Sequence, residues 1–263
     1  MNPIVLTESL GRRIISATEE WGRAWIFLFR TLVSSFKLPL RLHLIITQVF
    51  HIGVNSTLVI SLIGAFTGAV LAVQGEYTLS KFGATAFTGS AVALSLIREL
   101  GPVLTALMII GRAGSAITAE IGIMRITEQI DALRSMAVDP IKYLMVPRFI
   151  AGMIAVPLLT GMFIVIGIGG GYVVGVGLLN LSSGTFMSQM ISAVDNTDVI
   201  SGFVKSIVFG FIFGWVSCFK GYTCGFGAIG VNKATTQSVV IASSAVLVTD
   251  YFLTSILTRI FFE

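Results

Sequence analysis

The sequence predicts an all-α integral membrane protein with five transmembrane helices, and its composition carries this prediction. Of the 263 residues, 55% are hydrophobic and only 11% are charged, whereas about 25% of residues are charged in an ordinary soluble domain. The mean hydropathy is +0.93, and long uncharged runs recur along the chain. This composition argues against a water-soluble enzyme, because too few charges remain to cover its surface. It also argues against a disordered chain, since such chains are poor in apolar residues.

The first 41 residues form a separate N-terminal region, in which we expect an interfacial amphipathic helix that ends at Pro39. Apolar residues recur there at helical spacings with arginines and glutamates between them, namely Ile14, Trp21, Trp25, Leu28 and Leu32. Tryptophan is typical of the headgroup level of a membrane. An ordinary cytoplasmic helix is the alternative. Residues 42–263 then form the transmembrane domain.

Runs without Asp, Glu, Lys or Arg locate the five spans. One run covers residues 42–75 and another covers residues 149–194, while a helix needs about 20 residues to cross the hydrocarbon core. The second run is therefore interpreted as one long span followed by a polar loop rich in Ser and Asn. The predicted spans cover residues 52–74, 87–110, 150–177, 199–219 and 238–259.

The Lys and Arg residues outside these spans predict the orientation of the chain. The first 41 residues carry six of them, the connection 111–149 carries five and the connection 220–237 carries two. The connections on the other side carry only Lys81. Because basic residues gather on the cytoplasmic side, we expect the N-terminus inside and, after five crossings, the C-terminus outside.

The connection 111–149 contains a short amphipathic pattern. Ile123, Ile126, Ile130 and Leu133 fall on one stripe of a helix, and charges of both signs mark its other sides. A cytoplasmic helix with one apolar stripe is expected to dock on a surface. The mixed charges favour a groove in a partner protein over an anionic membrane, which would select Lys and Arg.

Four charged residues lie inside the predicted spans: Arg98, Glu99, Lys205 and Asp250. Each is costly in the membrane and needs a partner or a wet cavity. Arg98 and Glu99 are adjacent, so each requires its own partner, and Lys205 is a plausible partner of Asp250 or Glu99. The cluster is either a structural ion-pair network or a polar site for substrate headgroups or gating. Pro102 should also kink this span.

No catalytic or cofactor motif accompanies these charges. The sequence has no GxxxxGK[ST] phosphate loop, and its two histidines have no neighbouring nucleophile or carboxylate pair. Cys218 and Cys224 stand six residues apart, but a metal site would need further ligands. The basic residues flank apolar runs and do not form a nucleic-acid surface. We therefore expect no metal, no nucleic acid and no cofactor on this chain.

Several short blocks follow one another along nearly the whole chain. They are LAVQG at 71–75, ALSLIRELGP at 93–102, GRAGS at 111–115, TAEIG at 118–122, TEQ at 127–129, MAVDP at 136–140, PR at 147–148 and KATT at 233–236. In this order they resemble the MlaE/YrbE permease family, the membrane subunits of ABC transporters that work with MCE proteins on lipids.

The resemblance implies a phospholipid permease of the inner membrane that maintains lipid asymmetry as a homodimer. It implies two separate ATPase subunits that bind the ATP, a periplasmic MCE-domain protein and, in Gram-negative complexes, often a STAS-domain protein. The coupling helix maps onto about residues 119–138, with Glu120, Gly122, Ile123, Ile126, Glu128, Ile130 and Leu133 toward the ATPase. The lipid cavity maps onto Leu71, Gln74, Tyr77, Arg98 and Glu99. Lys205, Lys233 and Asp250 match charged positions of the family.

Two other functions remain open from the residues alone. A stand-alone secondary transporter could use the four intramembrane charges as an ion relay, although such folds commonly show two related halves and this sequence shows no repeat. A non-transporting scaffold could use the cytoplasmic helix to recruit a soluble partner.

Overall fold

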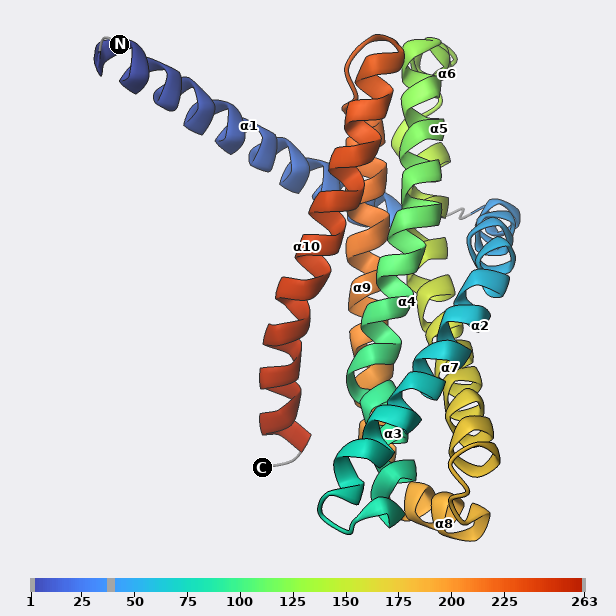
Figure 1. The fold of residues 1–263 in the computed structure, drawn as a ribbon. Coiled ribbons are helices and arrows are strands. Elements are labelled where there is room, and N and C mark those ends of the chain that lie inside the picture. Colours follow the sequence, from blue (N-terminus) through green and yellow to red (C-terminus); the bar gives the residue numbers. More distant parts are fainter. Residues whose placement is uncertain (1–2, 37–40, 262–263) are drawn as a thin grey trace.

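The computed structural model describes residues 3–36 and 41–261, and within these ranges every regular element is helical (Figure 1). The elements before the third span are α1 Pro3–Ser35, α2 Leu42–Ser80, η1 Thr85–Phe87, α3 Thr88–Ser95, η2 Leu96–Leu100, α4 Gly101–Ile109, η3 Ile110–Gly114, α5 Ser115–Ile126 and α6 Gln129–Ser135. The remaining elements are η4 Ile141–Met145, α7 Val146–Gly177, α8 Ser183–Ala193, α9 Asn196–Tyr222 and α10 Gly227–Phe261.

Within the described residues, five helical stretches are long and apolar enough to cross a membrane, which confirms the predicted five-span fold. They cover Leu42–Ser80, Thr85–Ile126, Ile141–Gly177, Asn196–Tyr222 and Gly227–Ile260. Each predicted span lies inside one of these stretches. Every stretch is longer than predicted, because its helix continues through residues beyond the roughly 20 that the hydrocarbon core requires.

The second span is a series of helical pieces that includes two π-helical turns, η2 and η3. In η2 the N–H of Gly101 donates to the carbonyl of Leu96, five residues earlier. A Cβ atom at position 101 would lie 2.4 Å from that carbonyl oxygen and 2.7 Å from a side-chain carbon of Ile164, so only glycine fits this position. Pro102 follows directly, so the kink expected at this proline lies next to η2 and stays a prediction.

Close packing of backbones holds α2 against α7. A Cβ atom at Gly68 would lie 1.7 Å from the carbonyl oxygen of Gly167, so the two helices touch through glycine. Small residues permit this approach between membrane helices. The segment 183–193, which the sequence assigns to a polar loop, instead forms α8. Ser182 caps its N-terminus, and the buried Phe186 packs it onto Gly89 of α3.

The helix α1 runs away from the bundle, and residues of its second half pack against it (Figure 1). Phe27 and Leu28 are buried, and the Trp215 indole N–H donates to the carbonyl of Ala24 at 3.2 Å. Trp25, in contrast, is largely exposed. The interfacial role of this helix stays a prediction, and Pro39, its expected end, lies outside the described residues.

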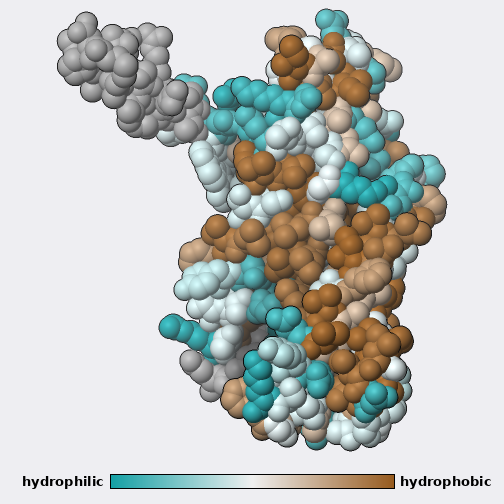
Figure 2. Space-filling model, in the orientation of Figure 1, coloured by the Kyte–Doolittle hydropathy of each residue, from teal (hydrophilic) through white to brown (hydrophobic). Residues whose placement is uncertain are grey.

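The bundle has two unlike ends. We call the end formed by α5, α6 and the turn between α9 and α10 the α5–α6 end, and the opposite end the α3–α8 end (Figure 1). A band of hydrophobic residues crosses the middle of the molecule, as Figure 2 shows. Only 11% of the most apolar stretch of α10 is buried inside the chain, compared with 56% for α9. The surface of α10 is therefore left for lipid or for another protein chain.

Candidate functional site

The four intramembrane charges come together at η2, which presents two adjacent charges to its neighbouring helices. The ammonium group of Lys205, on α9, lies 2.6 Å from a carboxylate oxygen of Glu99 and 3.2 Å from one of Asp250 on α10. It also donates to the hydroxyl of Thr254 at 2.7 Å. Lys205 is buried, so this cation is held entirely by its partners.

The backbone of η2 contributes to the same cluster. Proline has no N–H, so Pro102 leaves the carbonyl of Arg98 without its usual intrahelical donor. Lys205 donates to that carbonyl oxygen at 3.0 Å. The proline and the buried lysine are thus structurally linked, because one frees an acceptor in the membrane and the other satisfies it.

Arg98 points to a different carboxylate, which the sequence analysis missed. Its guanidinium group lies 2.6 Å from Asp198 at the start of α9. Asp198 is fully buried, and its second oxygen accepts the backbone N–H of Asp195 at 3.0 Å. The two aspartates form a capping box for α9. The D-x-x-D spacing was the available signal, since carboxylates stabilise helix N-termini.

The two charged side chains on η2 remain partly accessible. Arg98 exposes 39% of its side chain and Glu99 exposes 42%. Such charges within a membrane span normally face a bundle interior or a water-filled cavity. The arrangement can therefore offer a cation and a carboxylate, each already fixed by a buried partner, to a polar group in the membrane.

The other predicted cavity residues lie on α2. Leu71 is half-buried and packs on the core, whereas Gln74 and Tyr77 are exposed. The ammonium group of Lys81 sits 4.2 Å from the centre of the Tyr77 ring. The structure joins Arg98 and Glu99 to α9 and α10, and the cavity shared with α2 stays a prediction.

The predicted coupling helix does not form as one helix over 119–138. Residues up to Ile126 continue the second span as α5, and Glu128 adopts a left-handed conformation, with φ of 59°, that separates α5 from α6. The stripe is therefore broken. Ile130 is buried against its own chain, Ile126 and Leu133 are half-buried, and Ile123 is 50% exposed.

Two further predicted coupling residues make contacts within the chain. Glu120 pairs with the buried Arg148 of α7 at 3.2 Å. Gly122 faces the start of α10, where an added Cβ would lie 3.3 Å from Val231. These contacts tie α5 to α7 and α10, so a force on the α5–α6 end reaches two spans directly. Lys233 is exposed on the first turns of α10.

The two cysteines are both free. Cys218 is buried in α9, and the thiol of Cys224 lies 3.6 Å from the carbonyl oxygen of Gly122. Burial raises the pKa of Cys224 above its usual value, and the nearby Arg125 opposes part of that rise. Cys224 is therefore a poorly nucleophilic thiol at neutral pH.

Comparisons with known proteins agree with this architecture. A family model described as "Permease MlaE" matches residues 45–256. The chain is 44% identical to the intermembrane phospholipid transport system permease protein MlaE of Haemophilus influenzae, covering 95% of this chain and 96% of that protein. It is 43% identical to a probable ABC transporter permease protein of Rickettsia bellii, covering 97% and 98%.

The similarity also reaches a plant protein. The chain is 35% identical to the chloroplastic protein TRIGALACTOSYLDIACYLGLYCEROL 1 of Arabidopsis thaliana, covering 79% of this chain and 59% of that protein. The predicted family, and with it the prediction of a permease subunit that is not an enzyme, is confirmed by these matches. The chain belongs to the MlaE permease family.

Proposed function

We propose that this chain is the permease subunit of an ABC transporter that moves phospholipid between the inner membrane and a periplasmic MCE-domain partner, and so maintains lipid asymmetry. The name of the Haemophilus relative supports phospholipid as the substrate. The structural observation that carries the proposal is the half-exposed Arg98–Glu99 pair at a π-helical turn of an apolar span. Such a pair can contact a headgroup, while apolar walls accept the acyl chains.

The proposed transporter is a homodimer, with a lipid cavity between the two copies. The exposed apolar surfaces of α2 and α10 support this assembly, since only 28% and 11% of their most apolar stretches are buried within one chain. Leu71, Gln74 and Tyr77 would line the cavity from α2. Two ATPase subunits would bind ATP, and a STAS-domain protein is a further proposed component.

The proposed orientation places the N-terminus and the α5–α6 end in the cytoplasm and the C-terminus in the periplasm. A cysteine introduced at Ser183, in an otherwise cysteine-free chain, is expected to react with a membrane-impermeant maleimide in intact cells. A cysteine at Asp131 is expected to react only after the membrane is opened. Both residues are exposed, so accessibility is decided by the side of the membrane. The reverse labelling pattern would invert the proposed topology.

The α5–α6 end is the proposed docking site for the ATPase. Ile123 is 50% exposed and Met136 is 72% exposed at this end, and apolar side chains outside the membrane are typical of protein interfaces. This assignment moves the proposed contact away from Ile130, which the chain buries for itself.

We expect the double substitution Ile123→Asp and Met136→Asp to abolish co-purification of the ATPase, which the parent chain should retain in a two-to-two ratio. An unpaired carboxylate in an apolar contact costs more than the roughly 2–7 kcal/mol of an unpaired amide or hydroxyl group. Phe82→Asp, at an exposed apolar residue of the opposite end, serves as the matched control and should keep the ATPase. Retention of the ATPase by the double variant would place the docking site elsewhere.

A secondary transporter is the rival function, and the buried ionisable cluster around Lys205 is the observation that favours it. The same purification separates the two functions. A secondary transporter would be isolated without an ATPase and would respond to an ion gradient, whereas the proposed permease would respond to ATP.

A further inference from the structure

A pocket of about 260 Å³ lies where the first and third spans begin. We call it the α2–η4 pocket. It is bounded by the start of α2, by η4 and by the segment before η4. None of its lining residues belongs to the charged cluster at η2 or to the proposed ATPase contact.

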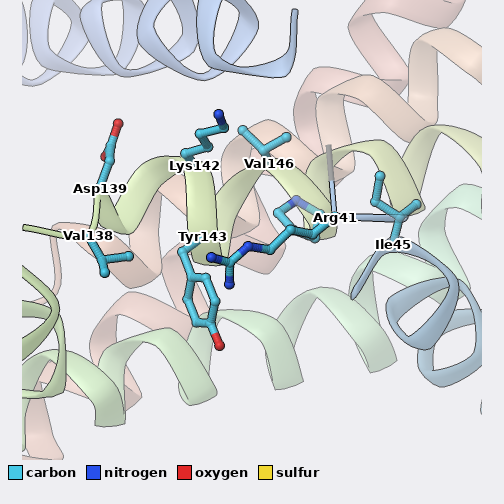
Figure 3. A pocket seen from close by; sticks show the side chains of 8 residues that line it. Arg41, Ile45, Val138, Asp139, Lys142, Tyr143 and Val146 are labelled. Atoms are coloured by element: carbon cyan, nitrogen blue, oxygen red, sulfur yellow. The ribbon is translucent and has the colours of Figure 1, made fainter. Parts of the chain in front are cut away.

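Two cations border the α2–η4 pocket. Arg41 extends from the start of α2 toward Tyr143, while the Lys142 side chain points away from the Tyr143 ring, on the opposite side of η4 (Figure 3). The guanidinium carbon of Arg41 lies 4.8 Å from the centre of the Tyr143 ring, a cation–π contact that holds the arginine over the pocket. Within residues 3–36 and 41–261, no carboxylate lies within 4 Å of either cation.

The one acidic residue in the lining already has a structural role. A carboxylate oxygen of Asp139 accepts the backbone N–H of Ile141 at 2.9 Å, which fixes the first turn of η4. Two cations and one carboxylate leave a net charge of +1 in the lining. The pocket therefore favours an anion, and Arg41 offers the planar fork that matches phosphate oxygens.

The rest of the lining is apolar. Ile45, Val138 and Val146 contribute apolar side chains to different parts of the lining (Figure 3). The pocket also lies where basic residues give way to the uncharged bodies of the first and third spans, the level at which headgroups meet a membrane protein. A ligand that fills this pocket would need both a phosphate and an apolar part, as an amphiphile has. A soluble anion would make no contact with the apolar side chains.

We propose that the α2–η4 pocket binds the phosphate headgroup of an anionic phospholipid, from the leaflet on the α5–α6 side of the membrane. A zwitterionic lipid fits less well, because its ammonium or choline group would meet a pocket that is already positive. Basic pockets between membrane helices are known sites for anionic headgroups. This proposal requires only that the chain spans the membrane, so it stands or falls separately from ATP-driven transport.

The test is lipid binding to the purified, delipidated full-length protein, followed by native mass spectrometry. Phosphatidylglycerol, phosphatidylcholine and soluble glycerol phosphate are titrated separately. We expect phosphatidylglycerol to bind at least tenfold more tightly than phosphatidylcholine, and glycerol phosphate to leave it undisplaced. Arg41→Gln and Lys142→Gln should each weaken phosphatidylglycerol binding about fivefold, the effect of one basic residue near a membrane surface.

Arg30→Gln is the matched control, because Arg30 is an exposed arginine on α1 outside the pocket. It should bind phosphatidylglycerol like the parent. Lys142 has no ion-pair partner among the described residues, so Lys142→Gln should melt like the parent and keeps the test readable if Arg41→Gln is unstable. The proposal would be overturned if Lys142→Gln bound phosphatidylglycerol like the parent, or if Arg30→Gln weakened binding equally. Displacement of the lipid by glycerol phosphate would also overturn it.

Discussion

Replacing Lys205 with methionine is expected to destabilise the protein by about 3 kcal/mol, measured by thermal or denaturant unfolding in detergent. The buried ammonium group is the partner of Glu99 and Asp250 and the donor to the Arg98 carbonyl. Removing one member of a buried ion pair typically costs about 3–5 kcal/mol, because the other charge stays buried and unpaired. The lower figure applies because Glu99 is partly exposed.

Two further variants separate the cost of an unpaired carboxylate from the cost of a lost hydrogen bond. Thr254→Val removes one hydrogen bond to Lys205 and should cost only about 1 kcal/mol. Adding Glu99→Gln to Lys205→Met neutralises one stranded carboxylate and should recover part of the lost stability. If Lys205→Met unfolds like the parent, the cluster does not hold the spans together.

Replacing Arg98 with alanine is expected to destabilise the protein by a similar amount, about 3–5 kcal/mol. Its partner Asp198 is fully buried and would lose both contacts with the guanidinium group. The sequence left two roles open for Arg98, a headgroup ligand or a structural partner. The contact with buried Asp198 supports a structural role, and the exposed 39% of the side chain is the part that the proposed headgroup contact would use.

A double-mutant cycle measures that role directly. Arg98→Ala combined with Asp198→Asn should be less destabilising than the sum of the two single changes, by more than about 1 kcal/mol, because contacting residues are not additive. Lipid that co-purifies with each variant is quantified in parallel. Unchanged stability together with lost lipid in Arg98→Ala would instead make Arg98 a headgroup ligand.

The five spans were predictable because only long apolar helices cross the hydrocarbon core, and such helices are visible in the sequence as uncharged runs. The pairing of Lys205 with Glu99 and Asp250 was also within reach, since a membrane leaves few alternatives for isolated charges. The pairing of Asp198 with Arg98 was not. The D-x-x-D spacing indicates only the cap of α9, and the place of Asp198 beside Arg98 depends on how α9 packs, a hundred residues further along the chain.

The α5–α6 end shows the limit of periodicity. Ile123, Ile126, Ile130 and Leu133 fit one helical stripe, yet a single left-handed residue, Glu128, divides them between two helices. A pattern of apolar spacing carries no information about such a break. Likewise, the polar composition of 178–198 hid α8, whose N-cap and one buried phenylalanine hold it in place.

We propose that this chain moves phospholipid with energy from ATP bound on separate subunits. The most direct measurement uses proteoliposomes that contain the chain with its ATPase, and follows transfer of a fluorescent phospholipid between the bilayer and an MCE-domain protein. We expect transfer to be coupled to ATP hydrolysis and to be lost in the Ile123→Asp, Met136→Asp variant. Phospholipid transfer that proceeds equally without ATP, or active ATP hydrolysis with no transfer, would contradict it.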